Sequence, residues 1–174
     1  MSSRSEKVKE IITEMFHQRN YLNINTDSTP ITALKDDGVN TIYAFNSIIE
    51  KLNNDEIHSY IGLLQEQKVK HAILVYEGAP TPAVKAVISN LPELDINIEL
   101  FHADDLQFNI TKHELVQKHE KLPQQEAKEF KGRYGSNIPS LLRTDAVVRF
   151  YDFHKGEIIK VTRKNGAISY RIVR

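Results

Sequence analysis

The chain has 174 residues, 40% hydrophobic and 26% charged, which suits one or two folded domains and argues against a disordered polypeptide. It contains no cysteine, which excludes disulfide bonds, thiolate metal sites and a cysteine nucleophile. The 23 basic and 23 acidic side chains cancel formally, and no apolar run reaches the roughly 20 residues of a membrane-spanning helix, so no membrane partner is expected.

The charges are distributed unevenly along the chain. Residues 1–127 hold 12 lysines and arginines against 19 aspartates and glutamates, a formal charge of −7. Residues 128–174 hold 11 against 4, a formal charge of +7. Such asymmetry favours an acidic partner for the basic part of the chain. The alternative is that the two parts differ in charge by chance and that both charged surfaces only face solvent.

A helix is predicted at the start of the chain. Ser3 and Glu6 have the spacing of a capping box, in which both side chains accept hydrogen bonds from backbone N–H groups of the first turn. An apolar stripe at helical spacing follows, made of Val8, Ile11, Ile12, Met15 and Phe16. The helix is expected to end near Asn20. Residues 23–38 are rich in Asn, Thr, Asp, Pro and Gly and are interpreted as a loop.

Strands and helices then alternate. The expected strands are residues 41–45, 71–76 and 96–100. The expected helices are a weak one over 46–52, one that Asp55 caps, and one over 82–90. This order is typical of an α/β layer with parallel strand pairs.

The end of the chain predicts a second, smaller domain. A helix is expected over 123–133, because proline suits the first turn of a helix. Two runs of β-type residues flank Asn165-Gly166, the strongest short signal for a hairpin, in which both turn residues are expected at positive φ. We therefore predict a mixed α/β domain over 1–105, a linker over 106–122, and an α+β domain with a β-hairpin over 123–174.

Residues 78–85 join a buried strand to a helix start and could bind an anion. Thr81 can cap the helix, Pro82 suits its first position, and Lys85 adds positive charge one turn later. Free N–H groups at such a start favour phosphate. The alternative is an ordinary capped helix start.

The histidines give little support for a metal site. His113 and His119, each followed by a glutamate, form the densest group of metal-binding residue types. Their spacing does not match the His-Glu-x-x-His helix motif, and no third ligand is obvious nearby. We predict no metal and no other cofactor, and interpret these histidines as surface or hydrogen-bonded side chains.

Enzymatic motifs are weak as well. The Glu-x-Lys pair of Glu66 and Lys68 has the form used by some metal-dependent nucleases, but it lies before the strand on which that chemistry would need it. The sequence has no Gly-x-Ser-x-Gly elbow, no phosphate-binding P-loop and no Gly-x-Gly-x-x-Gly motif. No catalytic residue is predicted. A nuclease-like enzyme on the α/β layer and a standalone transcription regulator remain alternative functions.

The C-terminal part resembles the H-type subunit of archaeal RNA polymerase and the C-terminal half of the fifth-subunit family of eukaryotic nuclear RNA polymerases. The family pattern Asn-Ile-Thr-x-His-x-Leu-Val appears at residues 109–116 as Asn-Ile-Thr-Lys-His-Glu-Leu-Val. Its Asp-Pro-Val-x-Arg-Tyr appears at 145–150 as Asp-Ala-Val-Val-Arg-Phe. Its Val-x-Lys-Ile-x-Arg and its final Tyr-Arg appear at 158–163 and 170–171.

The N-terminal part resembles the domain that the eukaryotic form has and the archaeal form lacks. Residues 17–22 are similar to the family's His-x-Arg-Gly-Tyr-Leu. Residues 72–75, followed by Thr81-Pro82 and Lys85, are similar to its Ala-Leu-Ile-Val strand and its Thr-Pro-Ser-Ala-Lys helix start. The resemblance therefore covers nearly the whole chain.

The resemblance implies a non-catalytic subunit of a multisubunit RNA polymerase. It implies a C-terminal domain that docks on the largest subunit among the other polymerase subunits, and an N-terminal lower jaw near downstream duplex DNA, which Thr81, Pro82 and Lys85 would face. The residues assigned to the docking surface or its support are Asp145, Arg149, Tyr151, Lys160, Arg163, Tyr170 and Arg171. Individually, Tyr151 and Tyr170 could instead belong to the core, and Asp145 could cap a short helix.

The chain also departs from the family pattern. Ala146 replaces a proline, Asp152 replaces a glycine, and Gly78 lies one position earlier than the family glycine. The N-terminal domain is trimmed between residues 22 and 39, and the hairpin loop at Asn165-Gly166 is shorter. This shortened form resembles the subunit of a large DNA virus more than a cellular one. A cellular protein would be nuclear, and a viral one would be found in the virion or the host cytoplasm or nucleus.

Overall fold

The computed structural model describes residues 3–174 and divides into two compact units, Met1–Phe108 (unit 1) and Asn109–Arg174 (unit 2). It is a mixed α/β structure with one sheet in each unit. Within residues 3–174, no helix has the length and apolar character needed to cross a bilayer.

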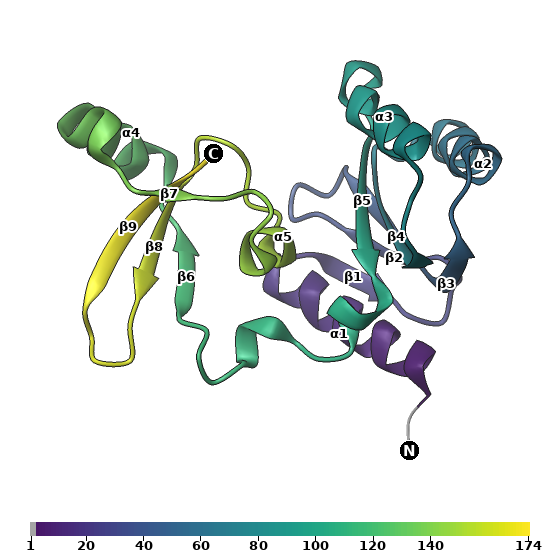
Figure 1. Ribbon diagram of the computed structural model, residues 1–174, viewed down its shortest axis with the longest axis horizontal. Coiled ribbons are helices and arrows are strands. Elements are labelled where there is room, and N and C mark those ends of the chain that lie inside the picture. The colour runs from purple at the N-terminus through teal and green to yellow at the C-terminus, as the bar shows by residue number, and fades with distance from the viewer. Residues whose placement is uncertain (1–2) are drawn as a thin grey trace. The chain divides into compact units, whose positions relative to one another are not determined.

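Unit 1 contains a five-stranded sheet in the order β1-β2-β3-β4-β5 (Figure 1). Its strands are β1 (Leu22–Asn25), β2 (Ile31–Leu34), β3 (Thr41–Lys51), β4 (His71–Gly78) and β5 (Asn97–His102). Strands β1, β2 and β3 pair antiparallel, whereas β3, β4 and β5 pair parallel. The predicted α/β layer with parallel pairs is therefore confirmed.

Helices cover both faces of this sheet (Figure 1). Helices α2 (Asn54–Glu66) and α3 (Pro82–Asn90) pack on the face that contains Phe45, Leu74 and Ile98. Helix α1 (Arg4–Gln18) lies on the other face and buries the predicted apolar stripe. Its predicted capping box is present, since the Ser3 hydroxyl and the Glu6 backbone N–H are 3.2 Å apart and the Glu6 carboxylate accepts from the Ser3 N–H.

Three local predictions for unit 1 are wrong. Residues 23–38 are not all loop, because β1 forms an exposed edge strand and β2 pairs with β3 next to it, with Ile31 and Ala33 buried. No helix forms over 46–52, because β3 continues to Lys51 in parallel pairing with β4, and β-branched Ile48 and Ile49 suit a strand. Helix α2 is capped by Asn53 with Glu56, not by Asp55.

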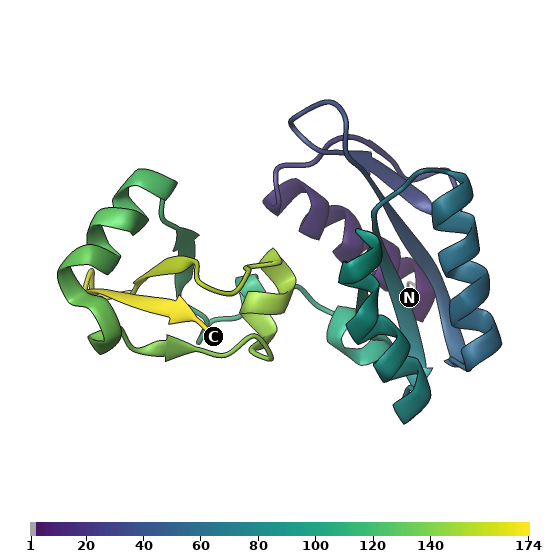
Figure 2. The same ribbon diagram turned by 90° about the horizontal axis from the view of Figure 1, so that it is seen from above.

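Unit 2 contains a four-stranded mixed sheet in the order β6-β8-β9-β7. Its strands are β6 (Lys118–Lys121), β7 (Ser140–Leu141), β8 (Ile158–Thr162) and β9 (Ile168–Val173). Helix α4 (Gln124–Tyr134), drawn in green beside the yellow hairpin strands in Figure 2, packs on one face through a cluster with Leu122, Ile138 and Ile158. Helix α5 (Ala146–Tyr151) packs on the other face, where Val148 meets Ile159, Val161 and Val173.

The predicted β8–β9 hairpin is confirmed, but its turn differs from the prediction. Gly166 has φ +81°, whereas Asn165 is not among the described residues with positive φ. The Gly166 N–H donates to the Arg163 carbonyl and the Arg163 N–H donates to the Ala167 carbonyl. This is a three-residue loop with a left-handed glycine at its end, which requires positive φ at only one position.

Candidate nucleic-acid and subunit interfaces

The start of α3 is built as the sequence predicts. The Val84 N–H donates to the Thr81 hydroxyl at 3.3 Å, and Pro82 occupies the first helical position. Val84 is fully buried and fixes this end of the helix against the sheet, whereas Thr81, Pro82 and Lys85 are exposed. The helix therefore presents its N-terminal backbone dipole and one lysine to solvent, an arrangement that favours an anion.

Gly78 sets the approach of the chain to this helix. A Cβ on Gly78 would lie 2.5 Å from the backbone carbonyl oxygen of Glu50, at the end of β3 where Lys51 pairs with Gly78. Only glycine allows two backbones to come this close. The end of β3 is therefore held beside the segment that leads into α3.

The C-terminal candidates lie on both sides of the second sheet. Lys160 and Tyr170 pair across β8 and β9 on the α4 side, where the Tyr170 ring is 4.6 Å from that of Phe130. Arg171 pairs with Ile159 and therefore lies on the α5 side. Arg163 follows β8 as the exposed residue that pairs with Ala167 at the base of the hairpin loop. The structure does not gather these residues on one face.

The three candidates at α5 form a local group. Asp145 is the N-cap of α5, accepting hydrogen bonds from the N–H groups of Val147 at 2.8 Å and Val148 at 3.4 Å. Tyr151, at the end of α5, stacks on Phe153 with ring centroids 5.1 Å apart. Arg149 and Tyr151 are half-buried. Asp145 thus has a structural role at the helix start, whatever else it does.

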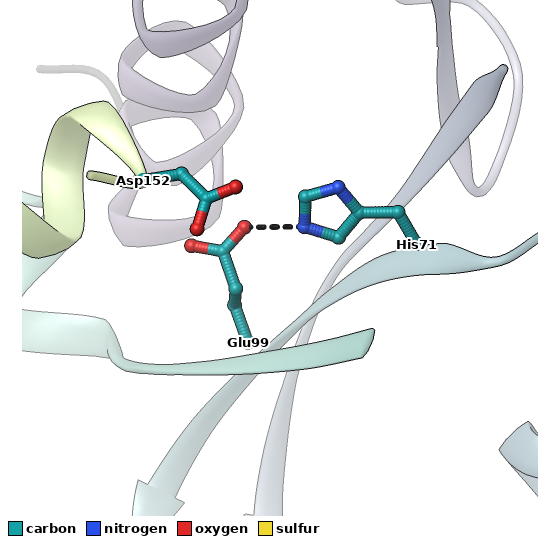
Figure 3. A group of neighbouring side chains, drawn as sticks. All are labelled: His71, Glu99 and Asp152. Carbon is teal, nitrogen blue, oxygen red and sulfur yellow. Dashed lines mark hydrogen bonds and ion pairs between the residues drawn. The ribbon is translucent and has the colours of Figure 1, made fainter. Parts of the chain in front are cut away.

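A buried ion-pair cluster in unit 1 has no counterpart among the predicted site residues. Arg19 follows α1 and binds both carboxylate oxygens of Glu99 on β5, at 2.7 and 2.8 Å. His71 Nε2, at the start of β4, is 2.7 Å from the same carboxylate (Figure 3). Only 3% of the Arg19 side chain and 14% of the Glu99 side chain are exposed. We refer to Arg19, His71 and Glu99 as the Glu99 cluster.

The electrostatics of the Glu99 cluster favour the charged carboxylate. Burial by itself raises the pKa of Glu99, but the Arg19 charge and the hydrogen bonds from His71 and Arg19 outweigh burial and lower the pKa to about 2. Because both carboxylate oxygens are paired, removal of a partner would leave a buried charge uncompensated, which is costly. The cluster connects the end of α1 with β4 and β5. Arg19 belongs to the motif at residues 17–22, and this motif was the sequence signal that could have pointed to the cluster.

The residues of the other candidate sites are spread out. Glu66 is the last residue of α2, and Lys68 follows it with φ +55° before β4 begins, so this pair is not on a strand. His113 Nδ1 accepts from the Leu115 N–H at 3.2 Å, while His119 lies on β6 with Nδ1 2.8 Å from the Gln117 carbonyl. Both histidines have local hydrogen-bond partners.

Comparisons with known proteins identify the family. The family model described as "RNA polymerase Rpb5, C-terminal domain" matches residues 108–173, which is nearly the whole of unit 2. The chain is 31% identical to "Putative DNA-directed RNA polymerase subunit 454R" of Invertebrate iridescent virus 6, over 97% of this chain and 98% of that protein. The chain belongs to the Rpb5 family of RNA polymerase subunits.

Cellular members of the Rpb5 family match over a smaller share of their own length. The subunit "rpabc1" of DNA-directed RNA polymerases I, II and III from Dictyostelium discoideum is 31% identical over 79% of this chain and 74% of its own length. The Caenorhabditis elegans "RPABC1" is 29% identical over 85% of this chain and 73% of its own. These comparisons give the nuclease alternative no support.

Proposed function

We propose that this Rpb5-family chain is a non-catalytic subunit of a multisubunit DNA-dependent RNA polymerase. Its C-terminal part docks on the largest subunit, and its N-terminal part lies as a lower jaw near downstream duplex DNA. The observation that carries the proposal is the similarity to a viral polymerase subunit over 97% of this chain. The proposal assigns residues 1–105 to the jaw, 123–174 to assembly, and 106–122, which contains β6, to the connection. It requires no cofactor.

The charge of unit 2 supports its role in docking. Residues 109–174 hold 14 lysines and arginines against 7 aspartates and glutamates, a formal charge of +7. Charge of one sign favours association with an acidic partner surface. We propose that docking uses or depends on Asp145, Arg149, Tyr151, Lys160, Arg163, Tyr170 and Arg171.

The charge of unit 1 limits its role at DNA. Residues 1–108 hold 9 lysines and arginines against 16 aspartates and glutamates, a formal charge of −7. Affinity for duplex DNA comes mainly from many phosphate contacts by basic side chains. We therefore propose that Thr81, Pro82 and Lys85 face the duplex only inside the assembled enzyme, where the rest of the polymerase holds the DNA in place.

Co-purification with the largest subunit tests the docking role. Arg149→Glu with Arg171→Glu should abolish co-purification from cells that express both chains, because two cations of the proposed interface are reversed. Arg143→Glu with Lys164→Glu makes the same change in net charge at exposed positions outside it and should leave co-purification intact. Unchanged assembly of a correctly folded Arg149/Arg171 variant would remove these residues from the interface.

DNA binding by the free and the assembled chain tests the jaw role. The free chain should bind duplex DNA more weakly than about 1 μM at physiological salt, since its N-terminal unit is acidic. In the assembled polymerase, a photo-reactive residue at position 85 should crosslink to downstream DNA. Sub-micromolar binding by the free chain would contradict positional contact, and a native mass without polymerase subunits would favour a standalone regulator.

A further inference from the structure

A groove of about 470 Å³ lies on unit 2 between α4 and the start of β8. Leu122, Ala127 and Ile158 are among the residues that line it, and Leu122 and Ile158 are buried members of the α4-side core. The volume falls within the roughly 300–1,000 Å³ of pockets that hold ligands. Ile158 is 0% and Leu122 8% exposed, whereas Ala127 is half-buried, so Ala127 and the edge of Leu122 form the small apolar base that a ligand side chain can contact.

Three lysines surround this apolar base. Lys121 pairs with Glu157 at 2.5 Å, whereas Lys128 and Lys131 of α4 have no carboxylate partner among residues 3–174. The Lys131 ammonium is 3.9 Å from where a Cβ on Gly156 would lie, so it reaches from α4 toward the turn before β8. Two lysines are thus available to bind negative charge at the groove.

The opposite side of α4 provides a contrast within the same unit. A smaller hollow of about 180 Å³ there is lined by Glu126 and Glu129 together with Arg133 and aromatic rings. Its charges are mixed, and acidic side chains would repel an anionic ligand. The two sides of α4 therefore differ in both size and charge, and only the lysine side is suited to acidic groups.

We infer that the lysine groove binds an acidic segment of a partner polypeptide. Carboxylates of the segment pair with Lys128 and Lys131, and one apolar side chain packs against Ala127 and the edge of Leu122. The formal charge of +7 on residues 109–174 attracts such a segment before contact. A nucleic acid fits less well, because its sugar–phosphate backbone does not use an apolar base and the groove supplies few phosphate contacts.

The lysine groove is separate from the residues proposed for docking on the largest subunit. None of the three lysines is among the seven residues proposed for docking on the largest subunit. The partner that supplies the acidic segment need not be the largest subunit. Peptide binding tests the groove and co-purification tests docking on the largest subunit. Either result can contradict its own proposal without affecting the other.

Peptide binding to the full chain tests the groove. The probe is a short fluorescein-labelled peptide of aspartate and glutamate residues with one central leucine, and the measurement is fluorescence anisotropy at low salt. Lys128→Glu with Lys131→Glu should weaken binding about tenfold, because two attractions become repulsions. Arg143→Glu with Lys164→Glu should stay within about threefold of the unchanged chain. Replacing the central leucine of the peptide by serine should also weaken binding.

Amide chemical shifts of the unchanged chain locate the peptide. The expected result is a set of shifts centred on Ala127, Lys131 and Gly156. Three outcomes would overturn the inference: no binding, equal binding by the Lys128/Lys131 variant, or shifts centred elsewhere on the chain. A short DNA duplex that displaces the peptide and depends on the same two lysines would also overturn it in favour of a nucleic-acid site.

Discussion

Unit 1 has a five-stranded sheet with helices on both faces and the buried Glu99 cluster, whereas unit 2 has a four-stranded sheet between two small apolar clusters. Their formal charges are −7 and +7. In unit 1 the best-buried ionic groups are paired with each other. In unit 2 most cationic side chains are exposed, and Lys128 and Lys131 lack a carboxylate partner within the described part of the chain.

This difference indicates that buried charges in unit 1 contribute to folding, whereas exposed charges in unit 2 contribute to association with a partner. A small unit buries a smaller fraction of its surface than a larger one, so unit 2 gains less stability from its own core. Exposed cations such as Lys128 and Lys131 contribute little to folding and can meet an acidic surface. Unit 1 pairs its most deeply buried charges, Arg19 and Glu99, internally, whereas its exposed charges are mostly carboxylates. Three changes test this contrast, beginning with the largest expected effect.

Arg19→Ala should destabilise unit 1 by about 3–5 kcal/mol, because it leaves the buried Glu99 carboxylate without its bidentate partner. Urea unfolding followed by NMR measures this loss, with the Ile98 amide reporting on unit 1 and the Ile159 amide on unit 2. Only the Ile98 transition should move to lower urea concentration.

Arg4→Ala is the matched control for Arg19→Ala. Arg4 also contacts two carboxylates, those of Glu77 and Asp104, but its side chain is 38% exposed. Exposed ion pairs add little to stability, so the Ile98 transition should hardly move. Equal effects of the two substitutions would show that burial does not set the contribution of these pairs.

Acid should weaken unit 1 in a defined pH range. The pKa of Glu99 is about 2 in the folded chain, against an ordinary value of 4.5. The pKa of Glu99 is lower in the folded than in the unfolded chain. The ionised carboxylate therefore stabilises the fold fully above about pH 4.5, and this stabilisation is lost as the pH falls toward 2. The loss is about 3 kcal/mol. The Ile98 unfolding midpoint should fall across this range, and Glu99→Gln should flatten that dependence.

Substitutions at Asp145 should separate its structural role from an interface role in unit 2. Asp145→Ala removes the N-cap of α5 and should lower the free energy of unfolding of unit 2 by about 0.5–2 kcal/mol, as reported by the Ile159 amide. Asp145→Asn keeps a capping oxygen and should leave stability nearly unchanged. If the carboxylate charge also contributes to docking, Asp145→Asn should weaken co-purification with the largest subunit. A variant that assembles normally would reduce Asp145 to a helix cap.

Sequence signals predicted the parts of the fold that depend on neighbouring residues. Helix α3 spans Pro82–Asn90, matching the predicted 82–90, because the capping threonine, the first-turn proline and Leu91-Pro92 lie beside the helix itself. Strand β4 was recognisable from its continuous apolar run. Strands β1 and β2 were missed, since each has only four residues and both lie in a stretch rich in Asn, Thr, Asp and Pro that has the composition of a loop.

Features that depend on distant residues could not be predicted. The bidentate pair between Arg19 and Glu99 joins positions 80 residues apart, and neither residue has a local pattern that points to the other. Likewise, the side on which Lys160 or Arg171 lies depends on the register of β8 with β9. A shift of one residue would exchange the two sides, so composition alone cannot separate them.

The contact between Gly78 and the Glu50 carbonyl limits which residues position 78 of this chain can accept. Any side chain at position 78 would push the end of β3 away from β4 and displace the segment that leads to Thr81. In a library with every amino acid at each position, glycine alone should survive at 78, whereas Ala83 and Lys85 should tolerate many replacements in a folding assay.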